Sequence, residues 1–299
     1  LAGFRPHEAD ESYEKIIAAL PSTDEQTIPI NGAGRGEKGF SRLPDKVVAL
    51  LHFGRSGTGL LHSLIDGHPE ISTLPSVYLR GYFNQGVWAK LSVDGWRGLP
   101  ERFADEFAVL FDARTSKPIP SRLGEKSIFI GKKEGMTSVG ENRDEFLSLD
   151  REVFCRTALR LMEGMGSVDP MSFLMVVHAA FEEVIGSTGE PGTNKRLCFY
   201  HIHNPDAYAQ PNFLRYAPDA RLLMMVREPI QNCESTVRCD FKDNNYNYNT
   251  TAHKILQTLF SIDQIALRMR DTVGIRLEDL KNRTEVTMQA LCAWLGIVE

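Results

Sequence analysis

One stretch decides the fold of this chain: Lys46-Val-Val-Ala-Leu-Leu-His-Phe-Gly-Arg-Ser-Gly-Thr-Gly-Leu60. It opens with a continuous apolar run between Pro44 and Gly54, which is typical of a strand buried on both faces of a parallel sheet. A Gly-rich turn follows, and then the amphipathic helical pattern of Gly59–Asp66. This order predicts a phosphate-binding loop, because glycines let the backbone approach an anion and the first N–H groups of a helix point towards it.

Two further strand patterns, Arg196–His203 and Arg221–Val226, are each followed by a proline and a helix-compatible stretch. Their alternation favours an α/β fold, with a P-loop-like parallel sheet flanked by helices and a large, mainly helical insertion. Helices are predicted at Glu101–Ala113, Arg143–Gly164, Pro170–Ile185 and Thr284–Leu295, and a late strand at Val273–Leu277. We expect residues 1–45 to form a helix and linker and residues 46–299 to form the main domain, with residues 82–186 as its acceptor-side insertion.

The amino-acid composition of the chain limits the kinds of partner that it can bind. The chain has 34 Lys plus Arg against 39 Asp plus Glu, so its net charge of −5 offers no general attraction for nucleic acid or an anionic membrane. Five cysteines without metal-ligand spacing, and no apolar run of membrane-spanning length, predict a cytoplasmic protein. The start at Leu1 is expected of a domain from a longer chain. No metal is expected either, and four histidines are interpreted as structural: His52, His62, His68 and His178.

The glycine spacing of the loop matches that of nucleotide triphosphatases, but Leu60 and Leu61 stand where Lys and Ser/Thr are required. No side chain there can reach a γ-phosphate or hold Mg²⁺, which counts against a P-loop kinase. Arg55 suits a nucleotide whose terminal group is transferred without a metal. The predicted donor-binding loop consists of Gly54, Arg55, Ser56, Gly57, Thr58 and Gly59.

A second anchor follows the Arg221–Val226 strand. Arg227 stands at the carboxyl end of this strand, where ligands of open α/β sheets gather, and its guanidinium can donate a fork of hydrogen bonds to a phosphate. Pro229 begins the next helix and Ser235 lies about two turns along it. Alone, this pattern is also that of a capped strand-to-helix turn. Two anchors in order, each at a strand end, favour a site.

These motifs resemble the PAPS-dependent sulfotransferases, where PAPS is 3′-phosphoadenosine-5′-phosphosulfate. Phe53–Glu70 is similar to that family's 5′-phosphosulfate loop and first helix, and Arg227 with Ser235 is similar to its 3′-phosphate anchor. The resemblance covers roughly residues 46–76 and 196–299. It implies transfer of a sulfo group from PAPS to an alcohol, with 3′-phosphoadenosine 5′-phosphate as the product. A further Gly/Lys/Arg loop of the family is missing before Glu299, so we expect that contact from elsewhere or a truncation here.

Sulfo transfer needs a base for the alcohol and donors aimed at the leaving oxygens, a role that Arg55 also suits. The resemblance places His203 on the family's base position and His201 on the position of a lysine, and the role of His201 stays open between catalysis and packing. Glu125 and Lys126 resemble a segment of carbohydrate sulfotransferases whose Lys touches the sulfo group. The base is therefore His203 or Glu125, with His203 ahead. A solvated surface pair is the alternative for Glu125 and Lys126.

The loop and the His201–Pro205 segment also resemble the sulfotransferase domains of olefin-forming, curacin-type modular polyketide synthases. This implies that the acceptor is the β-hydroxyl of a β-hydroxyacyl chain on an acyl carrier protein, with neighbouring synthase domains as partners. The insertion would supply an acyl pocket and a mobile cover. Its glycines are Gly131, Gly135 and Gly140, and its expected docking cations are Lys132, Lys133 and Arg143. The alternatives are a sulfotransferase for a free small-molecule or carbohydrate hydroxyl, and a non-catalytic nucleotide-binding module.

Overall fold

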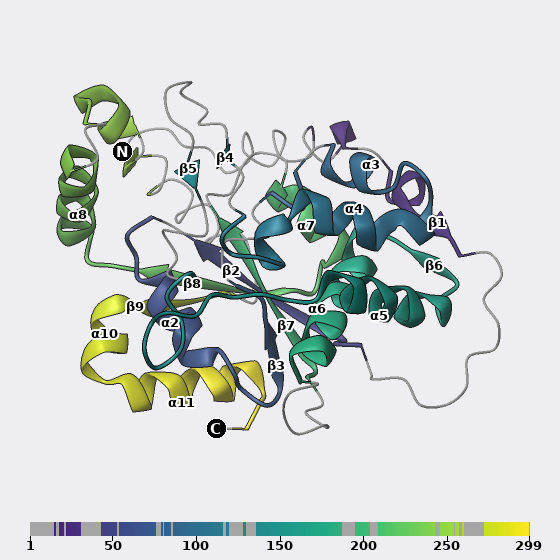
Figure 1. The fold of residues 1–299 in the computed structure, drawn as a ribbon. Coiled ribbons are helices and arrows are strands. Elements are labelled where there is room, and N and C mark those ends of the chain that lie inside the picture. The colour runs from purple at the N-terminus through teal and green to yellow at the C-terminus, as the bar shows by residue number, and fades with distance from the viewer. Residues whose placement is uncertain are drawn as a thin grey trace.

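The centre of the molecule is a parallel β-sheet of five strands in the order β3-β7-β2-β8-β9 (Figure 1). The strands are β2 (Lys46–His52), β3 (Ile71–Thr73), β7 (Leu197–His203), β8 (Arg221–Val226) and β9 (Thr272–Arg276). The computed structural model describes residues 15, 18–20, 22–30, 43–52, 54–75, 79, 81–84, 86–115, 118–119, 128–129, 136–186, 195–203, 209–242, 246–253, 255–256, 259 and 272–298. The predicted α/β class with a parallel sheet flanked by helices is confirmed.

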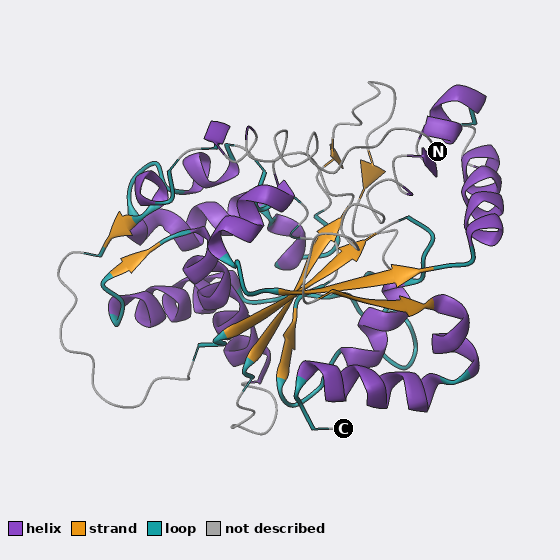
Figure 2. Ribbon diagram, turned by 180° about the vertical axis from the view of Figure 1, so that it is seen from behind, coloured by secondary structure: helices purple, strands orange, loops and turns teal. Residues whose placement is uncertain are grey.

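Helices cover both faces of the sheet (Figure 2), which is why β2 and β8 are apolar over most of their length. In β2, Val47, Ala49 and Leu51 face one apolar cluster, whereas Val48 and Leu50 face the other. The second cluster is covered by α2 (Thr58–Ile65), α10 (Leu277–Asn282) and α11 (Thr284–Leu295). The first is covered by α7 (Ala209–Tyr216) and by the insertion.

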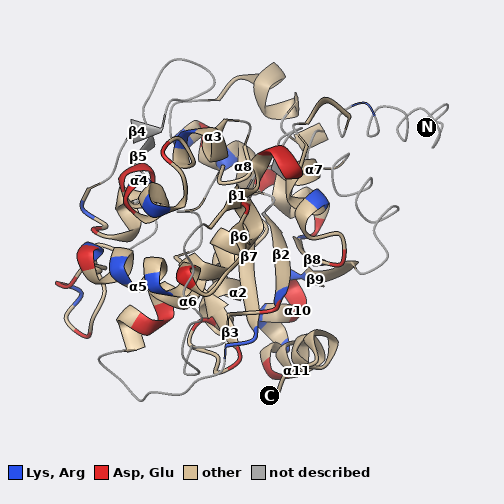
Figure 3. Cartoon of the chain, turned by 90° about the vertical axis from the view of Figure 1, so that its right-hand side faces the viewer, with Lys and Arg blue, Asp and Glu red and all other residues tan. Residues whose placement is uncertain are grey.

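The described part of the insertion is mainly helical, as expected. Its helices are α3 (Val87–Leu91), α4 (Leu99–Glu106), α5 (Arg151–Glu163) and α6 (Pro170–Gly186), with short 3₁₀ turns at Asp24–Gln26 before it and at Trp96–Gly98 and Ala108–Leu110 within it. An aromatic core of Phe103, Phe107, Phe111 and Phe154 packs α4 against α5. Arg151 forms ion pairs with Glu101 (2.9 Å) and Asp105 (2.8 Å). Figure 3 shows acidic and basic positions interspersed along α4 and α5.

Two helix predictions were too long. The helix expected over Glu101–Ala113 ends at Glu106, because Phe107 leaves helical dihedrals and a 3₁₀ turn follows. The helix expected over Arg143–Gly164 begins only at Arg151, because the Asp150 carboxylate accepts the backbone N–H of Val153 at 3.0 Å and caps it there. The residues before Asp150 form isolated β-bridges instead.

Short strand pairs complete the fold. β1 (Ile28–Pro29) pairs antiparallel with β6 (Ser167–Val168), and β4 (Pro118–Ile119) with β5 (Ile128–Phe129). Trp88 Nε1 donates to the carbonyl of Gln26 at 2.7 Å, so the described part of residues 22–30 is joined to the insertion. Among the described residues, no helix combines the length and the apolar character of a membrane span.

The topology creates a place for a ligand. The chain leaves β2 towards α2 on one face of the sheet and leaves β7 towards α7 on the other. The carboxyl ends of these adjacent strands therefore flank a topological switch point, where open α/β sheets bind ligands. α8 (Pro229–Lys242) departs from the same edge after β8 (Figure 1), and of its 14 residues only Asp240 is buried.

Candidate functional site

The predicted phosphate loop lies between the end of β2 and the start of α2. Gly57 caps the helix with a φ of +89°, and a Cβ at this position would overlap the side chain of Leu277 in α10. Only glycine meets both demands. Arg55 also has a left-handed φ, +67°, although it is not glycine. Ser56 and Thr58 are buried, so these two loop residues pack against the body of the protein.

The two predicted anchors are in contact with each other. Arg55 Nε donates to Ser235 Oγ at 3.1 Å, across 180 positions of sequence. Arg227 Nη1 donates to the backbone carbonyl of Arg55 at 3.5 Å. Asn232 Nδ2 donates to the carbonyl of Gly54 at 3.2 Å. The loop, the end of β8 and α8 thus meet in one site.

Asn232 was not found from the sequence. A signal for it existed, because Asn232 and Ser235 are three residues apart and therefore share one face of α8. A second unforeseen contact fixes the start of this helix. Glu278 Oε1, on α10, accepts the backbone N–H of Glu228 at 3.3 Å, directly after Arg227. The position of the second anchor therefore depends on α8 and α10 as well as on β8.

The chemistry of this edge suits an anion. Arg227 Nε is buried and has no hydrogen-bond partner among the described residues, which is costly for a guanidinium unless a ligand accepts from it. No described carboxylate forms an ion pair with Arg55 or Arg227, so the two cations are not neutralised by the described part of the chain. A Cβ added at Gly54 or Gly59 would meet no described atom within 4 Å. The residues present therefore fit a ligand that carries phosphate groups.

The histidine strand lies beside the loop. His203 ends β7, and its backbone pairs with His52 of β2, just before the loop begins. The side chain of His203 lies outside the described part. His201 is buried, and its Nε2 lies 2.9 Å from Nδ1 of His62 in α2. Burial lowers the pKa of His62, and the negative charge of Asp66 partly opposes this effect.

The remaining predicted residues are not brought to this edge by the described structure. Glu125, Lys126, Gly131, Lys132, Lys133 and Gly135 lie outside the described residues, so their roles stay predictions. Arg143 is described and exposed, in a turn with a φ of +56°. Gly140 opens the same turn with a φ of +81°. The turn lies between Val139 and Glu145, which form an antiparallel β-bridge.

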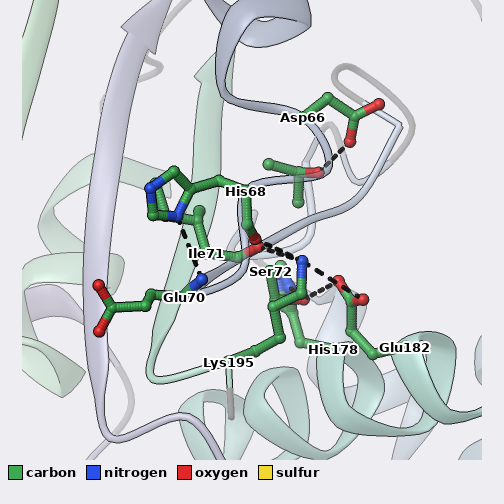
Figure 4. Close-up of polar contacts among 9 residues, drawn as sticks. Asp66, His68, Glu70, Ile71, Ser72, His178, Glu182 and Lys195 are labelled. Carbon is green, nitrogen blue, oxygen red and sulfur yellow. Dashed lines mark hydrogen bonds and ion pairs between the residues drawn. The ribbon is translucent and has the colours of Figure 1, made fainter. Parts of the chain in front are cut away.

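A second polar cluster joins β3 to α6 (Figure 4). Ser72 Oγ donates to Glu182 Oε1 at 2.8 Å and lies 2.9 Å from His178 Nδ1. Lys195 Nζ lies 3.7 Å from Glu182 Oε2 and donates to the carbonyls of His68 and Ile71. The imidazole does not stand between serine and carboxylate, and both Ser72 and His178 are fully buried, so this cluster is not a hydrolytic triad.

The cluster explains why His178 remains neutral. Because Ser72 donates to Glu182, Nδ1 of His178 must carry the proton that it shares with Ser72 Oγ. A second proton would go to Nε2, which is buried without a hydrogen-bond partner among the described residues. Burial accordingly lowers the pKa of His178 to about 3.

A shallow cavity of about 280 Å³ lies elsewhere, along the edge strand β9. Its lining includes Gly274, Arg276, Thr287 and Trp294. Neither Arg55 nor Arg227 belongs to the lining, and β9 is separated from β7 by two strands. The predicted phosphate loop and this cavity are therefore different features of the surface.

Comparison with known proteins gives structural likeness only. No family model matches the sequence, and no curated protein matches it. The sulfotransferase domain from the Synechococcus PCC 7002 olefin synthase is 15% identical, over 88% of this chain and 77% of that chain, with a TM-score of 0.47. The sulfotransferase STF9 from Mycobacterium avium is 14% identical, over 98% and 68% of the two chains, with a TM-score of 0.40. At these values no residue role is transferred, and the chain is similar in structure to two sulfotransferases.

Proposed function

We propose that this chain is a sulfotransferase that moves the sulfo group of PAPS to an alcohol. The observation that carries the proposal is the hydrogen bond between Arg55 and Ser235, with Arg227 bound to the carbonyl of Arg55. It brings the loop that resembles a 5′-phosphosulfate site and the residues that resemble a 3′-phosphate site to one edge of the sheet. PAPS carries phosphate at both the 3′ and the 5′ position of its ribose, so its binding needs both of these sites.

PAPS, when bound, supplies a sulfo group on a phosphate leaving group. The backbone N–H groups at the start of α2 are oriented to bind the 5′-phosphate, supported by the helix dipole. Arg55 is the cation nearest to this helix start in sequence and stabilises the charge that grows on the leaving oxygens. Arg227 Nε has the unused donor for the 3′-phosphate. His203 or Glu125 accepts the proton of the alcohol, and Lys126 is a further donor to the sulfo group.

The acceptor we propose is the β-hydroxyl of a β-hydroxyacyl chain carried by an acyl carrier protein. The proposal is supported by the sequence resemblance of the loop and of the His201–Pro205 segment to polyketide synthase sulfotransferase domains. Carrier proteins are acidic, so docking requires local cations on a chain of net charge −5. Arg143 is exposed at the surface of the insertion and follows Lys132 and Lys133 in the sequence. These three residues form the proposed docking patch.

Two experiments, carried out one after the other, test the proposal. Thermal unfolding is measured with 3′,5′-adenosine bisphosphate and, separately, with ATP and Mg²⁺. Stabilisation by the bisphosphate alone supports a PAPS site, whereas stabilisation by ATP and Mg²⁺ alone supports a kinase and refutes the proposal. Turnover with PAPS is then measured for the carrier-bound β-hydroxyacyl chain, the same acyl group on a small thiol, and a panel of phenols and sugars.

The acceptor panel separates three outcomes. A higher kcat/KM for the carrier-bound substrate supports the acyl acceptor. A higher kcat/KM for a free phenol or sugar replaces it with a general small-molecule sulfotransferase. Bisphosphate binding without transfer to any acceptor of the panel identifies a nucleotide-binding module and refutes the enzymatic proposal.

A further inference from the structure

A pair of histidines connects the helix after the donor loop to the strand that ends at His203. Nδ1 of His62 and Nε2 of His201 lie 2.9 Å apart. The two rings meet edge to face with centroids 4.9 Å apart, and Phe199 lies beside both, at 5.4 Å from His201 and 6.4 Å from His62. Since imidazole nitrogens at this separation share a proton, one ring donates and the other accepts.

Both ends of this hydrogen bond lead directly to the candidate site. His62 is the fifth residue of α2, which starts at Thr58 directly after the loop glycine Gly57. His201 stands two residues before His203, and the backbone of His203 is paired with His52 at the end of β2. The sheet fixes β7 through its pairing with β2, and this one contact between side chains ties α2 to the end of that strand.

The rest of the interface between α2 and β7 does not define their positions as closely. Leu61 and Ile65 of α2 and Leu197 and Phe199 of β7 belong to the same apolar cluster. Apolar packing tolerates small sliding movements and changes of shape, whereas a hydrogen bond depends on distance and angle. His201 is buried, so breaking the bond would leave an imidazole nitrogen without water, which makes the contact costly to lose.

We propose that His62 is a positioning residue for sulfo transfer, because its hydrogen bond to His201 holds α2, the helix that follows the donor loop, at a fixed place against the end of β7, whose backbone is itself held by pairing with β2. The inference rests on the proposed function and extends it to a histidine that the sequence alone suggested was structural. Stability alone does not require such a pair, since replacing both partners of a buried hydrogen bond by apolar groups of the same shape can be nearly neutral. Misplacement by about 1 Å can cost a catalyst on the order of 10²-fold in rate.

The variants are chosen to separate the effect of the hydrogen bond from the effect of side-chain volume. His62→Leu fills the space without a polar group. His62→Asn places an amide group where Nδ1 stands, and His62→Gln places it one bond too far along the side chain. The control is Ser63→Ala on the same helix, because Ser63 is exposed and its hydroxyl donates only to the carbonyl of Leu60 in its own helix, at 2.9 Å.

The first measurement needs no turnover. Imidazole ¹⁵N spectra of the full chain are recorded for the wild type and the variants, with the exposed His253 as an internal reference. In the wild type we expect His201 to show one protonated and one unprotonated ring nitrogen in a fixed tautomer. His62→Leu should shift the ring-nitrogen signals of His201, and His62→Asn should preserve them. Identical His201 signals in the wild type and His62→Leu would overturn the inference.

The second measurement separates binding of the donor from the chemical step. For His62→Leu we expect kcat to fall by about tenfold or more, while the KM for PAPS and the Kd for 3′,5′-adenosine bisphosphate change by less than about threefold. His62→Asn should recover most of the rate, and His62→Gln should not. Should His62→Leu fail to fold, the contrast between Asn and Gln decides alone. A purely structural role would lower the Tm and leave kcat per folded molecule unchanged.

Failure of the inference differs from failure of the proposed function. A wild-type chain that transfers sulfo groups, with His62→Leu or both amide variants equally active, overturns this inference alone. A wild-type chain that neither binds the bisphosphate nor transfers a sulfo group overturns the proposed function and this inference together.

Discussion

Acidification should unfold this protein partly through one residue, His178. It is fully buried in α6, and burial lowers its pKa to about 3. In the unfolded chain a histidine has a pKa of about 6.5. Between these values the unfolded state binds a proton that the folded state does not. The stability contributed by neutral His178 is therefore fully present above about pH 6.5 and is lost progressively as the pH falls towards about 3.

The magnitude follows from the same two values. Each pH unit below the unfolded pKa costs about 1.4 kcal/mol, so the step from pH 7 to pH 5 should lower the free energy of unfolding by about 2 kcal/mol through His178 alone. Other groups titrate over the same interval. Glu182, for example, has a raised pKa because it is partly buried, and its protonation in the folded state opposes the loss. A matched variant is therefore needed to isolate His178.

The assay compares the wild type with His178→Gln, which is polar but does not titrate. Urea unfolding at pH 7 and pH 5, extrapolated linearly to water, gives the free energy of unfolding at each pH. We expect the variant to lose about 2 kcal/mol less than the wild type over this step, whatever its stability at pH 7. The control, exposed His253→Gln, should follow the wild type within about 0.5 kcal/mol. Equal losses in the wild type and His178→Gln would refute the reasoning.

Three further predictions concern the site. Arg227→Ala should weaken binding of 3′,5′-adenosine bisphosphate by about 2–3 kcal/mol in calorimetry, since one charge-assisted phosphate contact is lost, and an unchanged Kd and KM for PAPS would remove Arg227 from the site. His203→Ala or Glu125→Ala, whichever is the base, should lower kcat by about 10²–10⁴-fold and leave bisphosphate binding intact; near-wild-type rates in both would reject the assignment. Gly57→Ala should destabilise the fold by about 1–3 kcal/mol in urea, because its backbone is left-handed and a Cβ would overlap a side chain of α10. Gly59→Ala should not destabilise the fold, because a Cβ at this position in α2 meets open space. Equal stability of the two variants would contradict the argument.

The candidate site was predictable where a motif is local. The order of apolar strand, glycine turn and helix identified the loop before α2, and the strand pattern of Arg221–Val226 matched β8 at both ends. The helix expected over Arg143–Gly164 was wrong at its start, because an Asp cap competes with helical periodicity and decides where the helix begins. The sequence pattern thus predicts that a strand or helix exists and where its centre lies. Where a helix begins or ends depends on single capping contacts.

The contacts of the site were not predictable in the same way. The sequence resemblance predicts one function for Arg55 and Ser235, yet only the folded chain places Arg55 Nε within hydrogen-bond distance of Ser235 Oγ. Asn232 lies on the loop-facing side of α8, and His62 meets His201 across the interface of α2 and β7. Each of these contacts joins residues from elements that are distant in sequence. No local pattern encodes them.

The sequence by itself determined the class of fold and the place of the glycine loop between β2 and α2, because periodicity and glycine placement are properties of neighbouring residues. The strand order β3-β7-β2-β8-β9 was decided only by tertiary structure. That order places β7 and β8 on the two sides of β2, so that His203 and Arg227 both end beside the loop. The physical reason is that a strand presents the same hydrogen-bonding edges whichever neighbour it has, and the choice of neighbour depends on how the helices pack over both faces of the whole sheet.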